Sequence, residues 1–217
     1  MPKHTLIAIV ATACVAGCTS TYKVHVNTYA EIDRVAGPMA SIYVVRDPNS
    51  PNPILRRQIE AKITRLLQGY GYHPVETTDA ADYILTYRTG FDSEKVMEYA
   101  PVGGPYGGLY ESYFGGWGFG YTTYLPYIET VYVHWLRMRL YRVDEAAASE
   151  ESVVWIGEAL MGTNDPEVRE AVNYLLVGCL EYLGRDTSEW ITTRIGRDDS
   201  RIIDIMGGRG QEAPAER

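Results

Sequence analysis

The chain has few cysteines, few phenylalanines and few positive charges for its length. Its 217 residues include 3 Cys and 3 Phe beside 18 Tyr, and 20 Lys and Arg stand against 28 Asp and Glu, which gives a formal net charge of -8. Three cysteines are too few for a disulfide-stapled scaffold. The acidic balance excludes a general nucleic-acid binder, because such proteins need clustered Lys and Arg. With 46% hydrophobic residues, the chain can bury the core of one domain.

Sequence patterns of catalytic and metal sites are also lacking. There is no GxSxG, P-loop or EF-hand pattern, and His25, His73 and His134 do not lie at metal-ligand spacing with another His or Cys. We therefore expect no catalytic residue, no metal, no cofactor and no enzymatic activity. We interpret His134 as a histidine at the edge of the core, and Cys179 as a buried, unreactive thiol on the apolar face of a helix.

The first 18 residues have the pattern of a signal peptide that ends at a lipidated cysteine. Leu6 to Ala16 is an uncharged run, shorter than the about 20 residues that span a bilayer and typical of a signal-peptide core. It ends in Val15, Ala16, Gly17 and Cys18, which resembles the bacterial lipobox. Cleavage before Cys14 would have a poorer leading sequence. We predict a signal peptide over 1–17 and acyl chains on Cys18 that attach the protein to a membrane.

The residue after the lipidated cysteine suggests the destination of the protein. In lipoproteins of this kind an Asp there would favour retention in the inner membrane, and this chain has Thr19. We therefore expect a location in the outer membrane, with the folded part facing the periplasm. Removal of the signal peptide would also remove Cys14 and leave Cys179 as the free thiol of the mature chain.

Hydrophobic periodicity predicts six strands and two long helices. The strands are expected over 22–29, 42–45, 72–77, 82–89, 130–143 and 153–161, and the helices over 53–68 and from the Asn164-Asp165-Pro166 cap to Gly184. The strands at 130–143 and 153–161 should form a hairpin, whereas 186–206 fits a short helix or a strand, with Ile202 to Ile205 as a short strand. This order predicts an α+β domain over 18–206, with a mostly antiparallel sheet, two long helices packed on one face and a disordered tail over 207–217.

One segment, rich in Gly and aromatic residues, departs in composition from the rest. Residues 101–121 hold eight Gly and seven aromatic residues, within a predicted loop over 99–127 that precedes the central hairpin. The aromatic residues are Tyr106, Tyr110, Tyr113, Phe114, Trp117, Phe119 and Tyr121. They could cover the open face of the sheet, contact a protein partner or a second copy, or contact a lipid interface or glycan.

Three stretches together resemble the bacterial lipoprotein family called domain of unknown function 4136. They are the helix block Ile54 to Tyr72 with Thr77 to Tyr83 after it, the Gly and aromatic insertion before the long strand, and Val154 to Ala159 followed by Asn164-Asp165-Pro166. The first strand lacks the family's usual aromatic-rich entry, and the chain continues past the closing helix. The resemblance implies a lipid-anchored α+β domain that faces the periplasm, and it implies no catalytic residues.

These observations favour a non-catalytic binding or adaptor module of the cell envelope. Its expected partners are the membrane, through the acyl chains on Cys18, and an envelope protein or a second copy of the chain. The alternative is a protein that binds a glycan or small molecule through the sheet face and the Tyr-rich loop. No nucleic-acid partner is expected.

Overall fold

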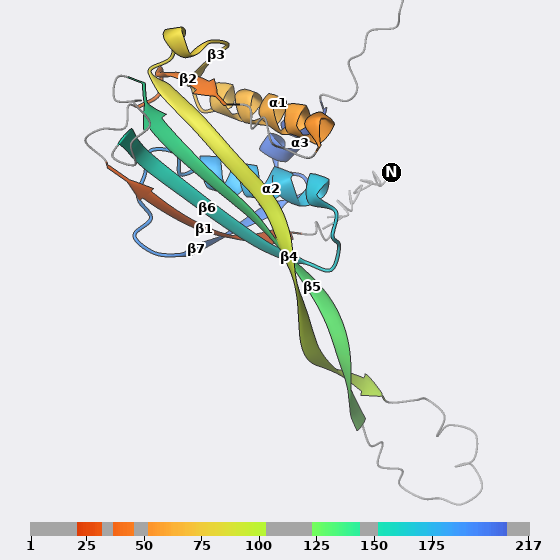
Figure 1. Ribbon diagram of the computed structural model, residues 1–217. Helices are drawn as coiled ribbons and strands as arrows, with labels where there is room; N and C mark the ends of the chain where they lie inside the picture. Colours follow the sequence, from red (N-terminus) through yellow and green to blue (C-terminus); the bar gives the residue numbers. More distant parts are fainter. Residues whose placement is uncertain (1–20, 32–36, 46–51, 103–122, 144–151, 208–217) are drawn as a thin grey trace, which may run out of the picture.

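The fold is built on one seven-stranded sheet. The computed structural model describes residues 21–31, 37–45, 52–102, 123–143 and 152–207 (Figure 1). The strands are β1 (Thr21–Ala30), β2 (Ser41–Val44), β3 (His73–Val75), β4 (Tyr83–Val102), β5 (Thr123–Arg142), β6 (Val153–Thr163) and β7 (Ile191–Gly196). The helices are α1 (Pro53–Gly69), α2 (Val168–Leu180) and α3 (Ser200–Gly207), with a 3-10 turn, η1, at Thr78–Ala80. The strand order is β3-β2-β4-β5-β6-β1-β7.

The predicted fold class is wrong, because the sheet is mixed. β2 runs parallel to both of its neighbours, β3 and β4, whereas the remaining pairs are antiparallel. A parallel pair needs a long crossover connection, and α1 supplies it between β2 and β3. The helices also differ from the prediction of two long ones. α1 has 17 residues, α2 has 13, and a third helix, α3, has 8.

The predicted hairpin between the two strongest strands is confirmed. β5 and β6 pair antiparallel from Tyr132 opposite Thr163 to Tyr141 opposite Val153, with an irregularity at Leu140. On β5, the even-numbered residues from His134 to Leu140 are buried. The odd-numbered residue Arg137 is exposed, as expected for a strand with one face on the core.

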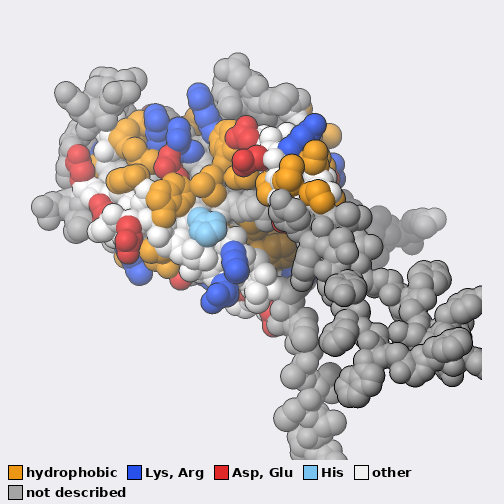
Figure 2. All heavy atoms as spheres, turned by 90° about the horizontal axis from the view of Figure 1, so that it is seen from below, with side chains coloured by type: hydrophobic (Ala, Val, Ile, Leu, Met, Phe, Trp, Pro, Cys, Tyr) orange, Lys and Arg blue, Asp and Glu red, His pale blue; other side chains and the backbone are white. Residues whose placement is uncertain are grey.

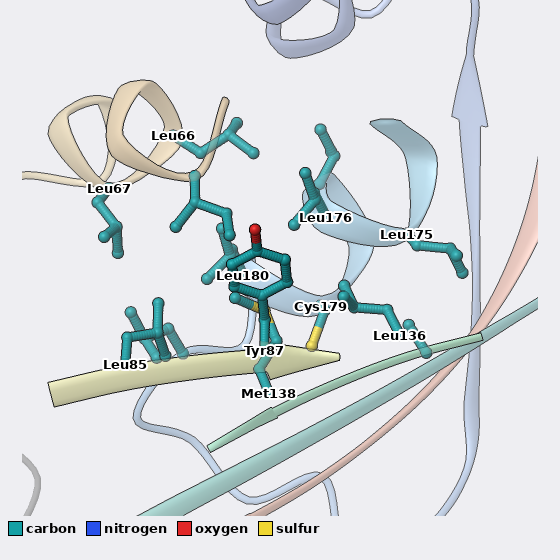
Figure 3. Packing of buried hydrophobic residues seen from close by; sticks show 14 of the residues in the cluster. Leu66, Leu67, Leu85, Tyr87, Leu136, Met138, Leu175, Leu176, Cys179 and Leu180 are labelled. Carbon is teal, nitrogen blue, oxygen red and sulfur yellow. The ribbon is translucent and has the colours of Figure 1, made fainter. Parts of the chain in front are cut away.

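The core lies between the sheet and the helices, and α2 is at its centre. Every residue of α2 from Ala171 to Leu180 is buried. The reason is that α2 contacts β6, β1 and β5 on one side and α1 and α3 on the other (Figure 1). Figure 3 shows Leu175, Leu176 and Cys179 of α2 between the side chains of the sheet and those of α1.

The first helix begins as the sequence predicts. Asn52 is the N-cap, and its Oδ1 accepts hydrogen bonds from the backbone N–H groups of Ile54, at 3.2 Å, and Leu55, at 3.0 Å. Pro53 occupies the first helical turn, where its missing N–H costs nothing. Gly71, with a φ of 86°, leads the chain away from the helix towards β3.

The segment from Ile202 to Ile205, expected as a short strand, lies instead in α3. Ile202 and Ile205 are buried one helical turn apart against the other helices. Arg201 fixes the start of the helix by donating to Asp199 Oδ1, at 3.0 Å, and to Glu181 Oε2, at 2.8 Å. The hydrogen bond from Arg201 is also the main cause that lowers the pKa of the Asp199 carboxyl.

Candidate functional site

The predicted lipidation and contact residues lie outside the described residues. This holds for Cys18 with its lipobox, Val15, Ala16 and Gly17, and for all seven aromatic residues from Tyr106 to Tyr121. Of the predicted disordered tail over 207–217, residues 208–217 are also outside them, whereas Gly207 ends α3 and was wrongly assigned to the tail. In the part of the chain that the structure describes, no helix is long and apolar enough to cross a membrane. The same part holds no group of His, Cys, Asp and Glu that could bind a metal ion.

His134 lies inside the core, in the middle of β5 and beside the loop that precedes α2. Its side chain is fully buried. Its Nε2 lies 3.1 Å from Thr163 Oγ1 and 2.9 Å from the carbonyl oxygen of Asp165. These contacts tie β5 to the loop that leads into α2, so His134 has a structural position, as the sequence suggested.

Cys179 is fully buried on α2, which confirms its predicted placement. Burial raises the pKa of its thiol well above the ordinary value, because a thiolate would lose its hydration there. The reactive thiolate form is therefore scarce at neutral pH.

We expect Cys179 to resist thiol reagents in the folded protein. A maleimide added at pH 7.5 should leave it unlabelled over hours, whereas addition of denaturant should make it react within minutes, because only unfolding exposes the sulfur. Mass spectrometry of the peptide that carries Cys179 measures both states. Rapid labelling of the native protein would contradict the buried position.

The longest strand pair forms the candidate contact site. β4 and β5 pair from Tyr83 opposite Arg142 to Val102 opposite Thr123, whereas β6 accompanies β5 only as far as Tyr132. Residues 94–102 and 123–131 therefore form a two-stranded ribbon that projects from the sheet (Figure 1). We call this ribbon the arm. It leads directly into 103–122, which carries the Gly and aromatic residues.

One side of the arm carries exposed apolar side chains next to the polar pair of Lys95 and Thr130. Met97 and Ile128 lie directly opposite each other across the two strands, and their side chains are 61% and 67% exposed. At the base of the arm, Phe91 is 45% exposed, with its ring 5.9 Å from the ring of Tyr132. Large apolar side chains grouped on an exposed surface indicate a contact with another molecule.

The other side of the arm is acidic. Glu94 and Glu98 of β4 alternate with Val96, and Glu129 lies opposite Val96 on β5. The hydroxyl of Tyr127 donates to Glu98 Oε2 at 2.9 Å, and this hydrogen bond is the main cause that raises the pKa of Tyr127. The arm thus carries two chemically different faces.

One strand edge of the arm is unpaired among the described residues. β2 pairs with β4 only at residues 83–85, so beyond Leu85 this edge of β4 has no strand partner among the described residues. Unpaired N–H and C=O groups on an edge can pair with another chain. An isolated two-stranded hairpin is also marginally stable in water, and a partner would stabilise it.

A cavity of about 460 Å³ lies beside this edge, at the base of the arm. Its lining includes Tyr87, Gly90 and Phe91 of β4, Trp135 of β5 and Ile59 of α1. A Cβ on Gly90 would lie 2.7 Å from Cζ2 of Trp135, so the glycine leaves the space that the indole ring occupies. The cavity gives the base of the arm an apolar recess next to an unpaired strand edge.

The prediction of a loop over 99–127 is wrong at both ends, because β4 continues to Val102 and β5 begins at Thr123. The expected strand ended at Thr89, since Gly90 and the polar run from Asp92 to Lys95 interrupt the hydrophobic pattern. Outside the sheet there is no core to require alternation, so this signal is weak. Hydrophobic alternation predicted a strand over 130–143. This strand includes Val131 at the start of the arm and Val133 at its base, and it includes no residue of the arm before 130.

The comparisons with known proteins identify a family but no activity. The model of the family described as a domain of unknown function (DUF4136) matches residues 20–180. No curated protein matches the chain.

Several solved structures share parts of the fold. A PDZ domain protein from Parabacteroides distasonis is 13% identical with a TM-score of 0.48, over 82% of this chain and only 40% of that one. A PelC dodecamer from Paraburkholderia phytofirmans is 14% identical with a TM-score of 0.42, over 75% of this chain and 98% of that one. A DUF4136 family protein from Bacteroides thetaiotaomicron is 17% identical with a TM-score of 0.33, over 70% of this chain and 94% of that one. Similarity at this level carries no argument about function.

Proposed function

The chain belongs to the DUF4136 family, which is described without a function, and from this premise we propose that it is a lipid-anchored adaptor of the bacterial envelope. In this proposal, acyl chains on Cys18 hold the protein at the outer membrane, and the arm binds a protein partner in the periplasm. The protein recognises its partner without transforming it.

The observation that carries the binding role is the exposed apolar side of the arm. Met97 and Ile128 extend beyond the sheet, and neither contributes to the buried core of the described residues. A two-stranded ribbon with two exposed large apolar side chains lowers the solubility of the chain and gains nothing for the fold. Its presence is explained by a partner that covers it.

The neighbouring sequence supports the same role. The arm ends at Val102 and restarts at Thr123, so the Gly-rich segment with its seven aromatic residues is attached to the tip of the arm. Tyr and Trp supply large contact area at low cost in conformational entropy. The support for the anchor comes from the sequence Val15 to Cys18.

We expect the variant Met97→Ser with Ile128→Ser to lose its partner while it keeps its fold. Both side chains are more than half exposed, so their replacement should change the melting temperature by no more than about 2 °C. Recovery of co-purifying envelope proteins from detergent extracts should fall at least about tenfold, because hot-spot apolar residues supply much of a binding energy.

The matched control is Ile203→Ser, which removes a 56% exposed side chain from α3, away from the arm. It should leave recovery of the partner unchanged. Equal recovery by the arm variant and the wild type would contradict the binding role of the arm.

A further inference from the structure

The face of the sheet away from the helices carries more positive than acidic side chains, although the whole chain is acidic. We call it the open face, since among the described residues no helix packs on it. The alternation of the strands assigns to this face five positive side chains, Lys23, Arg88, Arg137, Arg139 and Arg194. Glu158 in β6, Glu31 after β1 and Asp92 of β4, at the base of the arm, are the acidic residues that the same alternation assigns to it. The view from below in Figure 2 shows Lys and Arg side chains interspersed with Asp, Glu and hydrophobic ones.

Most of these positive charges have no acidic partner in the described structure. Arg137 forms an ion pair with Glu158, at 2.7 Å. In the described part of the chain, no ion pair is found for Arg88, Arg139 or Lys23. Arg88 also lies directly opposite Arg137. Like charges opposite each other destabilise a sheet, so the fold alone does not account for this pair.

The acidic side of the arm continues this same face of the two strands. The even-numbered residues of β4 run from Arg88 through Asp92 and Glu94 to Glu98 on one side. The odd-numbered residue Glu129 of β5 joins them. One continuous strand face therefore changes sign, from basic on the body to acidic at the arm.

We propose that the occupant of the open face is the arm of a second copy of this chain. The proposal rests on the proposed function, because it takes the arm as a binding element and gives its acidic side a partner of its own. A second copy is a suitable occupant because each chain carries both a basic face and an acidic arm. On this side of the arm, acidic residues outnumber positive ones. Opposite charges would thus be buried against each other.

Because both surfaces lie on one face of the chain, two copies can form a symmetric dimer with two identical contacts. When two copies face each other and run in opposite directions, each arm lies on the open face of the other. Both contacts form at once, and the acidic arm of each copy meets Arg88 and Arg139 of its partner. The apolar side of the arm, with Met97 and Ile128, is left for other proteins.

Charge reversal tests this contact. We expect the full acylated protein in a neutral detergent to associate reversibly in sedimentation velocity at low salt and to dissociate as the salt concentration rises. The variant Asp92→Lys with Glu94→Lys, at the base and start of the arm and called the arm variant, and the face variant Arg88→Glu with Arg139→Glu, should each weaken self-association at least about 100-fold. All four side chains are exposed or half-buried and have no ion pair among the described residues.

A mixing experiment separates lost contact from lost folding. The arm variant carries two positive side chains in place of two acidic ones beside an unchanged basic face, whereas the face variant carries two acidic side chains in place of two positive ones beside an unchanged acidic arm. Mixed in equal amounts, the two should associate with each other about as strongly as the wild type does with itself. The control variant Glu76→Lys with Glu189→Lys has the same change in net charge as the arm variant, at exposed positions outside the strands, and it should self-associate like the wild type.

Three outcomes would overturn the proposal. They are a monomer at all concentrations and salt conditions, self-association that both charge reversals leave unchanged, and a mixture that does not associate. If the open face instead binds only an anionic polymer or anionic vesicles, the arm variant will keep that binding and the proposal fails. A monomer that still loses its envelope partner through Met97→Ser with Ile128→Ser would reject self-association and leave the adaptor function intact.

Discussion

The variant Gly157→Ala should lose about 3 kcal/mol of its free energy of unfolding, a large share of the stability of an ordinary domain. Gly157 lies in β6, on the face that packs against α2. A Cβ there would lie 2.6 Å from Cζ2 of Trp155 and 2.5 Å from Cys179 Sγ, closer than real side chains approach. Chemical denaturation followed by tryptophan fluorescence measures the loss.

Neither neighbour of Gly157 can move away easily. Trp155 is 1% exposed and Cys179 is fully buried. The indole Nε1 donates to the carbonyl oxygen of Tyr182 at 3.1 Å, which fixes the ring in place. The overlap must therefore be relieved by a shift of α2 from the sheet, and α2 is the centre of the core.

Gly162→Ala in the same strand is the matched control. The nearest atom to its added Cβ is Val131 Cγ1 at 3.8 Å, an ordinary contact, and the residue is exposed. We expect its stability to stay within about 0.5 kcal/mol of the wild type. If Gly157→Ala were as stable as Gly162→Ala, the packing of α2 on β6 described above would be wrong.

The second large effect is expected from Cys18→Ser, which removes the predicted site of acylation. The variant should move from the membrane fraction to the soluble fraction of the periplasm and should no longer incorporate labelled palmitate. Each buried methylene contributes about 0.8 kcal/mol, so two or more acyl chains form a stable anchor and their loss releases the protein.

The chain provides a control for this test as well. Cys14→Ser changes the competing cysteine of the same segment, and it should leave membrane attachment and palmitate labelling intact. Retention of Cys18→Ser in the membrane would disprove the proposed anchor. Loss of membrane attachment in Cys14→Ser would show that Cys14, and not Cys18, is the lipidated residue.

Local signals in the sequence predicted the elements that local physics determines. Asn52 and Pro53 mark the start of α1, and alternation identifies β5 and β6, because a cap and a half-buried strand depend on near neighbours in the chain. Cys179 was placed correctly for the same reason, since it repeats at helical spacing with the apolar residues of α2.

The mixed sheet could not be predicted in this way. The pairing of β2 with β3 and β4 depends on how α1 turns the chain back, and the pattern of Ile42 to Val45 fits either direction of pairing. The run from Ile202 to Ile205 is so short that its pattern fits a strand or a helix equally well. Its contacts with α1 and α2, which the sequence does not reveal, stabilise the helix α3.

The candidate site followed from composition only in part. The Gly and aromatic segment was singled out at once, yet its residues lie outside the described structure. The arm that carries this segment has exposed residues on both faces, as at Glu94 and Met97, so no buried face imposes a pattern. The arm is defined by the pairing of β4 with β5, which is a contact between residues far apart in the sequence.

The most direct test of the arm as the binding element is photocrosslinking in intact cells. A photoreactive residue at Met97 or Ile128 should form adducts with a defined partner, whereas the same residue at Ile203, which is comparably exposed on α3, should form none. Adducts at Ile203 that match those of the arm, or no adduct at either arm position, would contradict the account.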